Sequence, residues 1–224
     1  MLQILRDIYT DLELSNALIF KGGTALMFFY DLPRVSIDLD FNLIEPNKEK
    51  ETAVYRKIHN ILLQYGTIDD EAQKFYGPIL VLDYGKGERK LKVEISNRQQ
   101  DNRYEVKTFM GINMLVMNIA DMFAHKLCAL LDRSDLANRD IFDCWFFMEN
   151  RTPINKNLVE SRMNMPFPEY LQICSDTLNS LSDKGLLNGI GDLIDDKMKT
   201  FVRSKLRTET IMLLQFYKEF PIFC

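Results

Sequence analysis

The periodicity of hydrophobic and polar residues changes near residue 118. Before that point, short segments with the period of two that is typical of β-strands are interspersed with segments of helical periodicity. After it, the pattern is helical to the end, with interruptions near residues 134, 151–153, 165–168 and 183–191. The pattern therefore predicts an α/β (α+β) protein, with an α/β half over residues 1–117 and an all-helical half over residues 118–224.

The α/β half contains a pair of glycines between a predicted strand and a predicted helix. Helices are expected over residues 2–14, 23–30 and 47–65, and strands over residues 17–21, 79–84, 91–96, 105–109 and 114–117. At such a junction, backbone N–H groups attract phosphate, and Gly22 and Gly23 would permit its close approach. Thr24 can cap the helix or contact the ligand. An ordinary tight turn could use the same residues, and only the next motif favours a phosphate site.

Two aspartates follow the glycines in a strand-like pattern. In Ile37-Asp38-Leu39-Asp40-Phe41, apolar residues alternate with acids. In a strand, the apolar side chains would face a core and both carboxylates would project to the opposite side. Two carboxylates so placed can share divalent cations, and a pair of Mg²⁺ ions can bridge the attacking and leaving oxygens of a phosphoryl displacement. The segment therefore predicts metal-assisted phosphate chemistry.

Together these motifs resemble the AbiEii abortive-infection toxin family of the nucleotidyltransferase superfamily. The matching segments are Lys21-Gly22-Gly23-Thr24-Ala25-Leu26 and Arg34-x-Ser36-x-Asp38-Leu39-Asp40-Phe41, within a likeness that covers about residues 15–150. The resemblance implies a nucleotidyltransferase-like mixed sheet with flanking helices. It implies that Asp38 and Asp40 bind Mg²⁺ or Mn²⁺. It also implies that a nucleoside triphosphate is held by Gly22, Gly23, Thr24, Arg34 and Ser36.

The resemblance leads us to expect a third acidic residue on a neighbouring strand. Leu91-Lys92-Val93-Glu94-Ile95 has the period of a strand and makes Glu94 the candidate third metal ligand. Such runs are also common in edge strands, where lysine and glutamate keep the edge soluble. Arg34 likewise has two interpretations. It can assist in holding the β- and γ-phosphates, or it can pair with Asp31 or Asp38 in a turn.

Lys126 lies in an unexpected position on the predicted helix over residues 118–132. At about 100° per residue, Ile119, Phe123 and Leu130 share one face, and Lys126 falls among them. Arg133 lies on the same side, seven residues further on. Burying an ammonium group is costly unless it is paired or reaches water or a ligand. Lys126 is therefore a candidate for an ion pair or a functional contact.

The next predicted helix, over residues 137–149, carries two acids that can meet Lys126. Asp140 and Asp143 stand at i, i+3 and so lie near one another. The resemblance implies that Lys126, Arg139 and Asp140 complete the active site, with Asp143 in a supporting role. Lys126 would contact the triphosphate or activate the nucleophile. The alternative is a buried salt bridge that fixes the packing of the two helices.

Composition limits the class of protein. The chain of 224 residues is 46% hydrophobic and 27% charged, with a net charge of −4, which is typical of a globular protein. Its most apolar window, residues 112–131, contains Asn118, Asp121, His125 and Lys126, which a bilayer would penalise. We therefore expect a cytoplasmic protein without a membrane partner. The four cysteines lack metal-binding or disulfide spacing and are expected to be reduced thiols.

The expected reaction is attack by a substrate hydroxyl on the α-phosphorus of a nucleoside triphosphate, with release of pyrophosphate. Mg²⁺ or Mn²⁺ is the expected cofactor. The resemblance implies the 3′ end of tRNA as the acceptor and a cognate antitoxin as a partner. Two alternatives are nucleotidylation of a small molecule or a protein, and a non-catalytic module that binds a nucleotide or a partner.

The negative net charge argues against a protein that coats nucleic acid through a global positive field, so any RNA contact must be local. One candidate is a basic stripe at i, i+4 and i+8 on the predicted last long helix, formed by Lys199, Arg203 and Arg207. The stripe can bind RNA phosphates, or it can simply be the solvated face of an amphipathic helix.

Overall fold

The computed structural model describes residues 1–85, 87–132 and 136–224 and divides into two compact units. The first unit comprises residues 1–31 and 35–117, and the second comprises residues 32–34 and 118–224. The division at residue 118 coincides with the change in hydrophobic periodicity. The inclusion of residues 32–34 in the second unit has no signal in the sequence pattern.

The first unit is built on one mixed sheet with the strand order β3-β4-β5-β2-β1-β7-β6. Pairs β1–β7 and β2–β5 are parallel, and the other neighbours are antiparallel. The mixed α/β fold expected from the sequence is confirmed. The strands are β1 Leu18–Lys21, β2 Leu39–Leu43, β3 Thr67–Lys74, β4 Gly77–Asp83, β5 Leu91–Ser96, β6 Tyr104–Phe109 and β7 Ile112–Met117.

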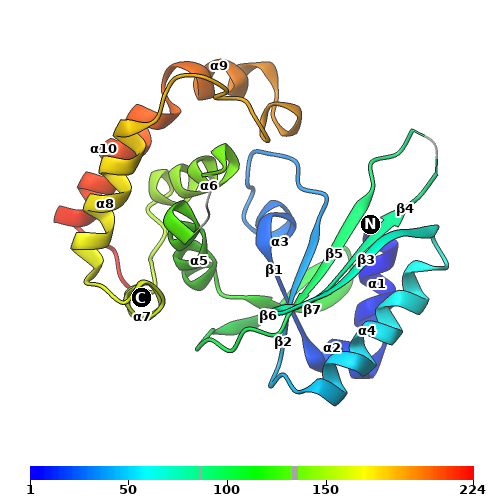
Figure 1. The fold of residues 1–224 in the computed structure, drawn as a ribbon. Helices are drawn as coiled ribbons and strands as arrows, with labels where there is room; N and C mark the ends of the chain where they lie inside the picture. Colours follow the sequence, from blue (N-terminus) through cyan, green and yellow to red (C-terminus); the bar gives the residue numbers. More distant parts are fainter. Residues whose placement is uncertain (86, 133–135) are drawn as a thin grey trace. The chain divides into compact units, whose positions relative to one another are not determined.

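Four helices flank this sheet, namely α1 Leu2–Thr10, α2 Leu12–Ala17, α3 Gly22–Phe29 and α4 Lys48–Leu62. Figure 1 shows α1 and α4 on one face of the sheet and α3 on the other. The face toward α1 is apolar, because Leu39, Phe41 and Val93 are fully buried and the rings of Phe41 and Tyr9 lie 6.3 Å apart. The opposite side chains of β2 and β5 are polar, and they form the candidate site.

Three local predictions for the first unit were wrong in detail. The helix expected over residues 2–14 is two helices, because the Asp11 side chain accepts hydrogen bonds from the N–H groups of Glu13 and Leu14 and so begins α2. Strand β3 was not predicted, because its residues are largely polar and exposed and it pairs only along one side, with β4. Strand β2 begins at Leu39, so Asp38 lies just before it.

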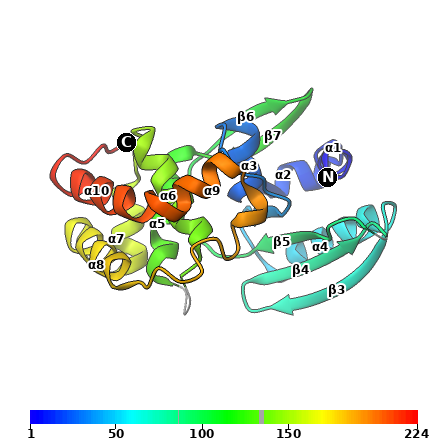
Figure 2. The same ribbon diagram turned by 90° about the horizontal axis from the view of Figure 1, so that it is seen from above.

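The second unit is helical, as the periodicity predicts. Its elements are α5 Ile119–Asp132, α6 Asn138–Glu149, α7 Lys156–Met163, α8 Phe167–Ser180, the 3₁₀ helix η1 Gly191–Leu193, α9 Asp196–Ser204 and α10 Leu206–Glu219. Figure 2 shows α8 and α10 running side by side. In the core, the Phe123 ring stacks on Phe147 at 4.9 Å and meets the edge of Tyr217 at 5.8 Å.

Two boundaries in this unit differ from the expected ones. Helix α8 begins at Phe167, so Pro168, which was expected to interrupt the helical pattern, lies inside it. Pro168 falls in the first turn, where a backbone N–H has no partner within the helix, so the missing N–H of proline costs no hydrogen bond. The stripe of Lys199, Arg203 and Arg207 is not on one helix, because α9 ends at Ser204 and α10 begins at Leu206. The predicted interruption at Ser134 lies outside the described residues.

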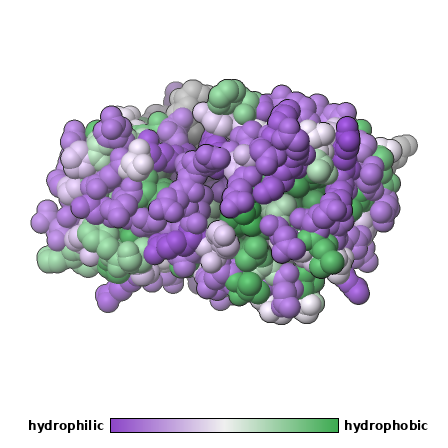
Figure 3. All heavy atoms as spheres, turned by 90° about the horizontal axis from the view of Figure 1, so that it is seen from below, coloured by the Kyte–Doolittle hydropathy of each residue, from purple (hydrophilic) through white to green (hydrophobic). Residues whose placement is uncertain are grey.

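Hydrophobic side chains lie mainly inside the two units. On the face drawn in Figure 3, hydrophilic side chains predominate and hydrophobic ones gather in separate patches. Cys128, Cys144 and Cys174 are buried thiols and Cys224 is exposed. Within the described ranges, every helix is too short or too polar to span a bilayer.

Candidate active site

The polar face of the first unit brings together the three acids predicted to bind metal. Asp40 on β2 lies directly opposite Glu94 on the parallel strand β5, and opposite Lys21 on β1. Side chains of directly opposed residues point to the same face of a sheet. Strand β5 is flanked by β4 and β2, so the edge-strand explanation for Glu94 is wrong. Asp38, Asp40 and Glu94, with Lys21 and Lys92, are called the carboxylate cluster below.

Lys92 is the residue of this cluster that sequence reasoning missed. Its Nζ lies 3.2 Å from Glu94 Oε2 and 3.9 Å from Asp38 Oδ2. Burial lowers the pKa of Lys92, but the carboxylates of Asp40, Glu94 and Asp38 outweigh that effect and raise the pKa above its ordinary value. A charged ammonium group therefore lies between two of the acids. The sequence did contain a signal for Lys92. It precedes Glu94 by two residues in a predicted strand, so the two side chains must project from the same face of the sheet.

Gly22 allows the Asp40 carboxylate to lie against the first residue of α3. The backbone of Gly22 has φ +78°, and a Cβ at this position would be 2.3 Å from Asp40 Oδ2. A side chain is therefore excluded both by the left-handed backbone and by the carboxylate. Burial raises the pKa of Asp40, against the opposing effect of Lys92 and Lys21. The glycine junction thus makes room for the Asp40 carboxylate, which is predicted to bind metal.

Thr24 and Ser36 are buried and hold the segment that leads to Asp38. The Thr24 hydroxyl donates a hydrogen bond to the carbonyl oxygen of Asp38 and lies 3.0 Å from Ser36 Oγ. Thr24 is fully buried and Ser36 is 9% exposed. Thr24 does not cap α3, whose N-cap residue is Lys21. These contacts give both hydroxyl groups a positioning function for Asp38, whereas their predicted contact with a nucleotide stays a prediction.

The second unit contains a separate group of charges, which we call the buried ion cluster. Lys126 on α5 lies 2.7 Å from Asp143 and 3.1 Å from Asp140, both on α6. Arg34 forms a bidentate pair with Asp143, with Nε–Oδ1 at 2.6 Å and Nη2–Oδ2 at 2.7 Å. The side chains of Asp140 and Asp143 are completely buried, and 17% of the Lys126 side chain is exposed. The expected meeting of Lys126 with the two acids is therefore present.

Mutual attraction stabilises the charged forms in this cluster. Burial raises the pKa of Asp143, but the opposing effect of Lys126 and Arg34 is larger. The pKa of this carboxyl is therefore below its ordinary value. Burial lowers the pKa of Lys126, but Asp143 and Asp140 raise it above its ordinary value. The bidentate pair with Asp143 was predicted by neither interpretation of Arg34. It explains why residues 32–34 belong to the helical unit.

Comparisons with known proteins identify the family. The sequence matches the family described as "Nucleotidyl transferase AbiEii toxin, Type IV TA system" over residues 3–204. The chain belongs to this AbiEii family. The resemblance inferred from the glycine and aspartate motifs is thereby confirmed, and the protein is a nucleotidyltransferase of a toxin family. Among curated protein sequences, none matches significantly.

Solved structures share the fold of this AbiEii protein. JHP933 from Helicobacter pylori superposes with a TM-score of 0.60 at 20% identity, covering 98% of this chain and 90% of the other. MenT4, a nucleotidyltransferase toxin from Mycobacterium tuberculosis, superposes with a TM-score of 0.60 at 17% identity, covering 97% of this chain and 85% of the other. At these identities the likeness establishes the fold.

The carboxylate cluster of the AbiEii protein suits Mg²⁺ that arrives with a phosphate ligand. Within residues 1–85, 87–132 and 136–224, no three His, Cys, Asp or Glu side chains converge closely enough to hold a metal ion by themselves. Mg²⁺ usually takes only one or two carboxylates and completes its shell with water and substrate phosphates. Asp38 and Glu94 already hold a cationic group, the ammonium of Lys92. The donor chemistry therefore fits the metal that the family implies.

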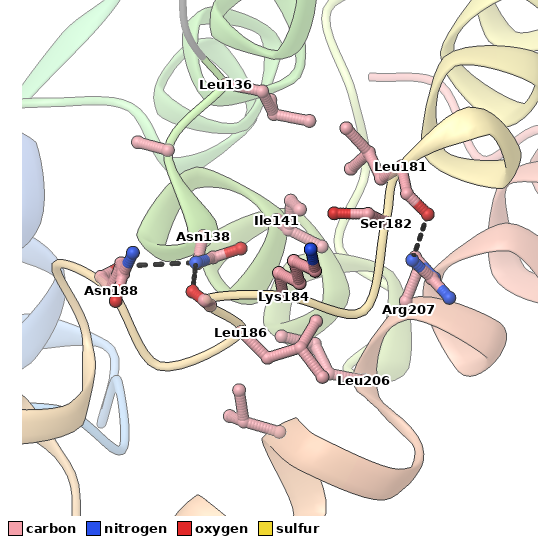
Figure 4. Close-up of a pocket in the computed structure, with 13 residues that line it drawn as sticks. Leu136, Asn138, Ile141, Leu181, Ser182, Lys184, Leu186, Asn188, Leu206 and Arg207 are labelled. Carbon is pink, nitrogen blue, oxygen red and sulfur yellow. Dashed lines mark hydrogen bonds between the residues drawn. The ribbon is translucent and has the colours of Figure 1, made fainter.

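The remaining predicted site residues lie in the second unit. Arg139 is half-buried in the first turn of α6, and Arg133 lies outside the described residues. Arg207 borders the pocket of about 400 Å³ drawn in Figure 4. Its guanidinium donates to the carbonyl oxygen of Leu181 at 2.6 Å and also pairs with Asp183. Lys199 pairs with Asp196 at 2.9 Å. Two of the three residues of the basic stripe thus already have anionic partners.

Proposed function

We propose that this protein is an Mg²⁺-dependent enzyme that transfers a nucleoside monophosphate from a nucleoside triphosphate to RNA, with the 3′ end of tRNA as acceptor. The observation that supports this most is the carboxylate cluster. Asp40 and Glu94 share one face of the sheet beside a glycine-led helix start, and Lys92 lies between Glu94 and Asp38, which comes just before β2. The family description adds a toxin–antitoxin setting and suggests an antitoxin as a partner.

In this proposal, Asp38 and Asp40 hold the metal ions, with Glu94 as the third carboxylate. Bound Mg²⁺ supplies Lewis-acid stabilisation of the charge that develops on the phosphate oxygens. Gly22 and Gly23 present backbone N–H groups to the triphosphate at the start of α3. Thr24 and Ser36 hold the Asp38 segment in place. The acceptor hydroxyl attacks the α-phosphorus, and pyrophosphate leaves.

Lys126 is proposed to contact the triphosphate, because part of its side chain is exposed while its acidic partners are not. Asp140 and Asp143 are closed to solvent and act on Lys126 through charge and hydrogen bonding. We therefore assign both acids a positioning function in place of direct contact with the substrate. Arg34 acts on the same group through its bidentate bond to Asp143.

The test is incubation of the purified protein with Mg²⁺, each labelled nucleoside triphosphate and total tRNA, followed by a denaturing gel. A variant carrying Asp38→Asn and Asp40→Asn is the control, because it removes two negative charges while nearly preserving side-chain size. Label on RNA with the wild type alone is expected. If neither the wild type nor the variant labels RNA, RNA is not the acceptor. Label on a protein or a small molecule would identify that molecule as the acceptor instead.

A further inference from the structure

The turn between β3 and β4 presents two aromatic side chains to solvent. Phe75 is 87% exposed and Tyr76 is 50% exposed. Among the large hydrophobic side chains of the described residues, Phe75 is the most exposed. The two rings meet edge to face with their centroids 4.9 Å apart, so they form one exposed aromatic patch. Contiguous exposed apolar patches mark sites of interaction, whereas single exposed apolar side chains do not.

The turn is held rigidly, so the rings are displayed in a defined position. The Asn97 N–H donates to the carbonyl oxygen of Tyr76 at 3.0 Å, and Asn97 Nδ2 donates to Glu51 Oε2 at 2.8 Å. Gly77 follows the turn with φ +108°, and a Cβ there would lie 2.0 Å from the carbonyl oxygen of Ile95. The turn is therefore fixed to the end of β5 by hydrogen bonds and by close backbone packing.

Cationic side chains surround the rings. The Arg98 guanidinium lies over the Tyr76 ring, 3.9 Å from its centroid. Lys48, Lys74 and Arg98 line a cavity of about 610 Å³ beside the two rings. The one acid that lines this cavity, Glu51, is 6% exposed and is already bonded to Lys48 and Asn97. The accessible part of the surface is thus aromatic and positively charged.

We propose that this surface, formed by Lys74, Phe75, Tyr76 and Arg98, binds a single-stranded segment of the acceptor RNA. Aromatic rings beside cations suit nucleic acid, because bases stack on the rings while the phosphates meet the positive charges. A protein partner with an apolar contact would be opposed by the cations that border the rings. The inference rests on the proposed function for its choice of RNA as acceptor.

The surface belongs to the same unit as the carboxylate cluster and is connected to it by β5. Asn97, which holds the turn, follows Glu94 by three residues, or about 10 Å along an extended backbone. The cavity beside the rings is lined by Lys48 and Glu51 of α4, which covers the sheet face opposite to the cluster. Several nucleotides would therefore separate an RNA end at the cluster from a base stacked on Phe75. This location was not signalled by the basic stripe of α9 and α10, which lies in the second unit.

The test is fluorescence anisotropy of a labelled single-stranded RNA of about ten nucleotides, measured without metal or triphosphate. Phe75→Ser is expected to weaken RNA binding about ten-fold, as for the loss of one stacked base. The matched control is Phe220→Ser, which replaces a 66% exposed phenylalanine in the second unit and is expected to leave the Kd unchanged. Because Phe75 is exposed, its replacement leaves the thermal midpoint near that of the wild type.

The outcomes separate this inference from the proposed function. Equal RNA affinity for Phe75→Ser and wild type would contradict the proposed RNA-binding surface, whether or not RNA is labelled in the transfer assay. A protein partner would then be the remaining explanation for the exposed ring. Ten-fold weaker binding by Phe75→Ser, without label transfer to RNA by the wild type, would support the surface and refute RNA as the acceptor. A loss of affinity equal in Phe220→Ser and Phe75→Ser would also overturn it.

Discussion

The carboxylate cluster and the buried ion cluster are built from the same kinds of residue but differ in how far their acids are exposed to solvent. In the carboxylate cluster, three carboxylates face two ammonium groups, and the side chains of Asp38, Glu94 and Lys92 are about one-third exposed. In the buried ion cluster, two acids face Lys126 and Arg34, and both acids are inaccessible. In the first the carboxylates outnumber the ammonium groups, and in the second the acids are held in ion pairs that are closed to solvent.

The difference indicates different functions. In a buried set of bidentate and short ion pairs, the acids are closed to solvent and are already compensated by their cationic partners. Carboxylates in reach of solvent attract cations, and the Lys92 ammonium group lies beside two of them. The pKa directions also differ: Lys126 and Arg34 outweigh burial and lower the pKa of Asp143, whereas burial outweighs Lys92 and Lys21 and raises the pKa of Asp40.

The largest expected effect is a difference in stability between two single variants, each of which lacks one acid of one cluster. Asp143→Asn leaves Arg34 and Lys126 without their shared carboxylate, so we expect the free energy of unfolding to fall by about 3–5 kcal/mol. Asp38→Asn removes one of three like charges, so its stability should stay within about 1 kcal/mol of the wild type. Thermal unfolding measures both. Equal losses in the two variants would contradict the assigned difference.

The next effect is acid sensitivity, which also follows from Asp143. Its folded-state pKa is below the ordinary value of 3.8, so its contribution to stability is present above that value and is lost as the pH falls through the lower, folded pKa. We expect the thermal midpoint to decrease below about pH 4, and to depend less on pH in Asp143→Asn. Asp196→Asn is the control. Lys199 also lowers the pKa of this carboxyl, but the Asp196 side chain is 96% exposed, and exposed ion pairs contribute little to stability. This variant should therefore keep the pH dependence of the wild type. A wild-type midpoint that is constant down to about pH 2 would refute this prediction.

A smaller stability effect, with a large loss of activity, is expected for Gly22→Ala. Gly22 and Gly111 both have φ +78°, but only at Gly22 would a Cβ meet Asp40, whereas nothing lies within 4 Å of one at Gly111. Both alanine variants should lose about 1–2 kcal/mol to the left-handed backbone. Only Gly22→Ala should displace the Asp40 carboxylate and abolish label transfer. Similar transfer by the two variants would show that the close approach is not required.

Part of this arrangement was predictable from local sequence, and part was not. The alternation of acids placed Asp38, Asp40 and Glu94 on one face, because strand periodicity is a local property. A lysine on an apolar helical face pointed to an ion pair of Lys126 with Asp140 or Asp143. The partner of Arg34 was not predictable, because it lies 109 residues away in sequence and no periodicity connects the two.

Other features escaped prediction because their causes are tertiary. Strand β3 lacks an apolar alternation, since it lies at the edge of the sheet, and its pairing with β4 determines its conformation. Thr24 suggested a cap or a ligand contact, whereas its hydroxyl bonds to the Asp38 carbonyl, 14 residues on. The aromatic turn at Phe75 was missed because exposure cannot be read from residue type alone.

The smallest expected effect is also the most direct test of the central claim, that the carboxylate cluster binds a divalent cation against the repulsion of the Lys92 ammonium group. The measurement is isothermal titration of Mg²⁺ or Mn²⁺ into the wild type and Lys92→Met. Lys90→Met is the control, because Lys90 is on the same segment but pairs with Asp69 at 2.6 Å. Asp38→Asn serves as the binding-deficient variant.

We predict that Lys92→Met binds the cation about ten-fold more tightly than the wild type, because a repelling positive charge about 4 Å from the acids is removed. Lys90→Met should match the wild type, and Asp38→Asn should bind more weakly. Equal affinities for Lys92→Met and wild type, or undiminished binding by Asp38→Asn, would contradict the account.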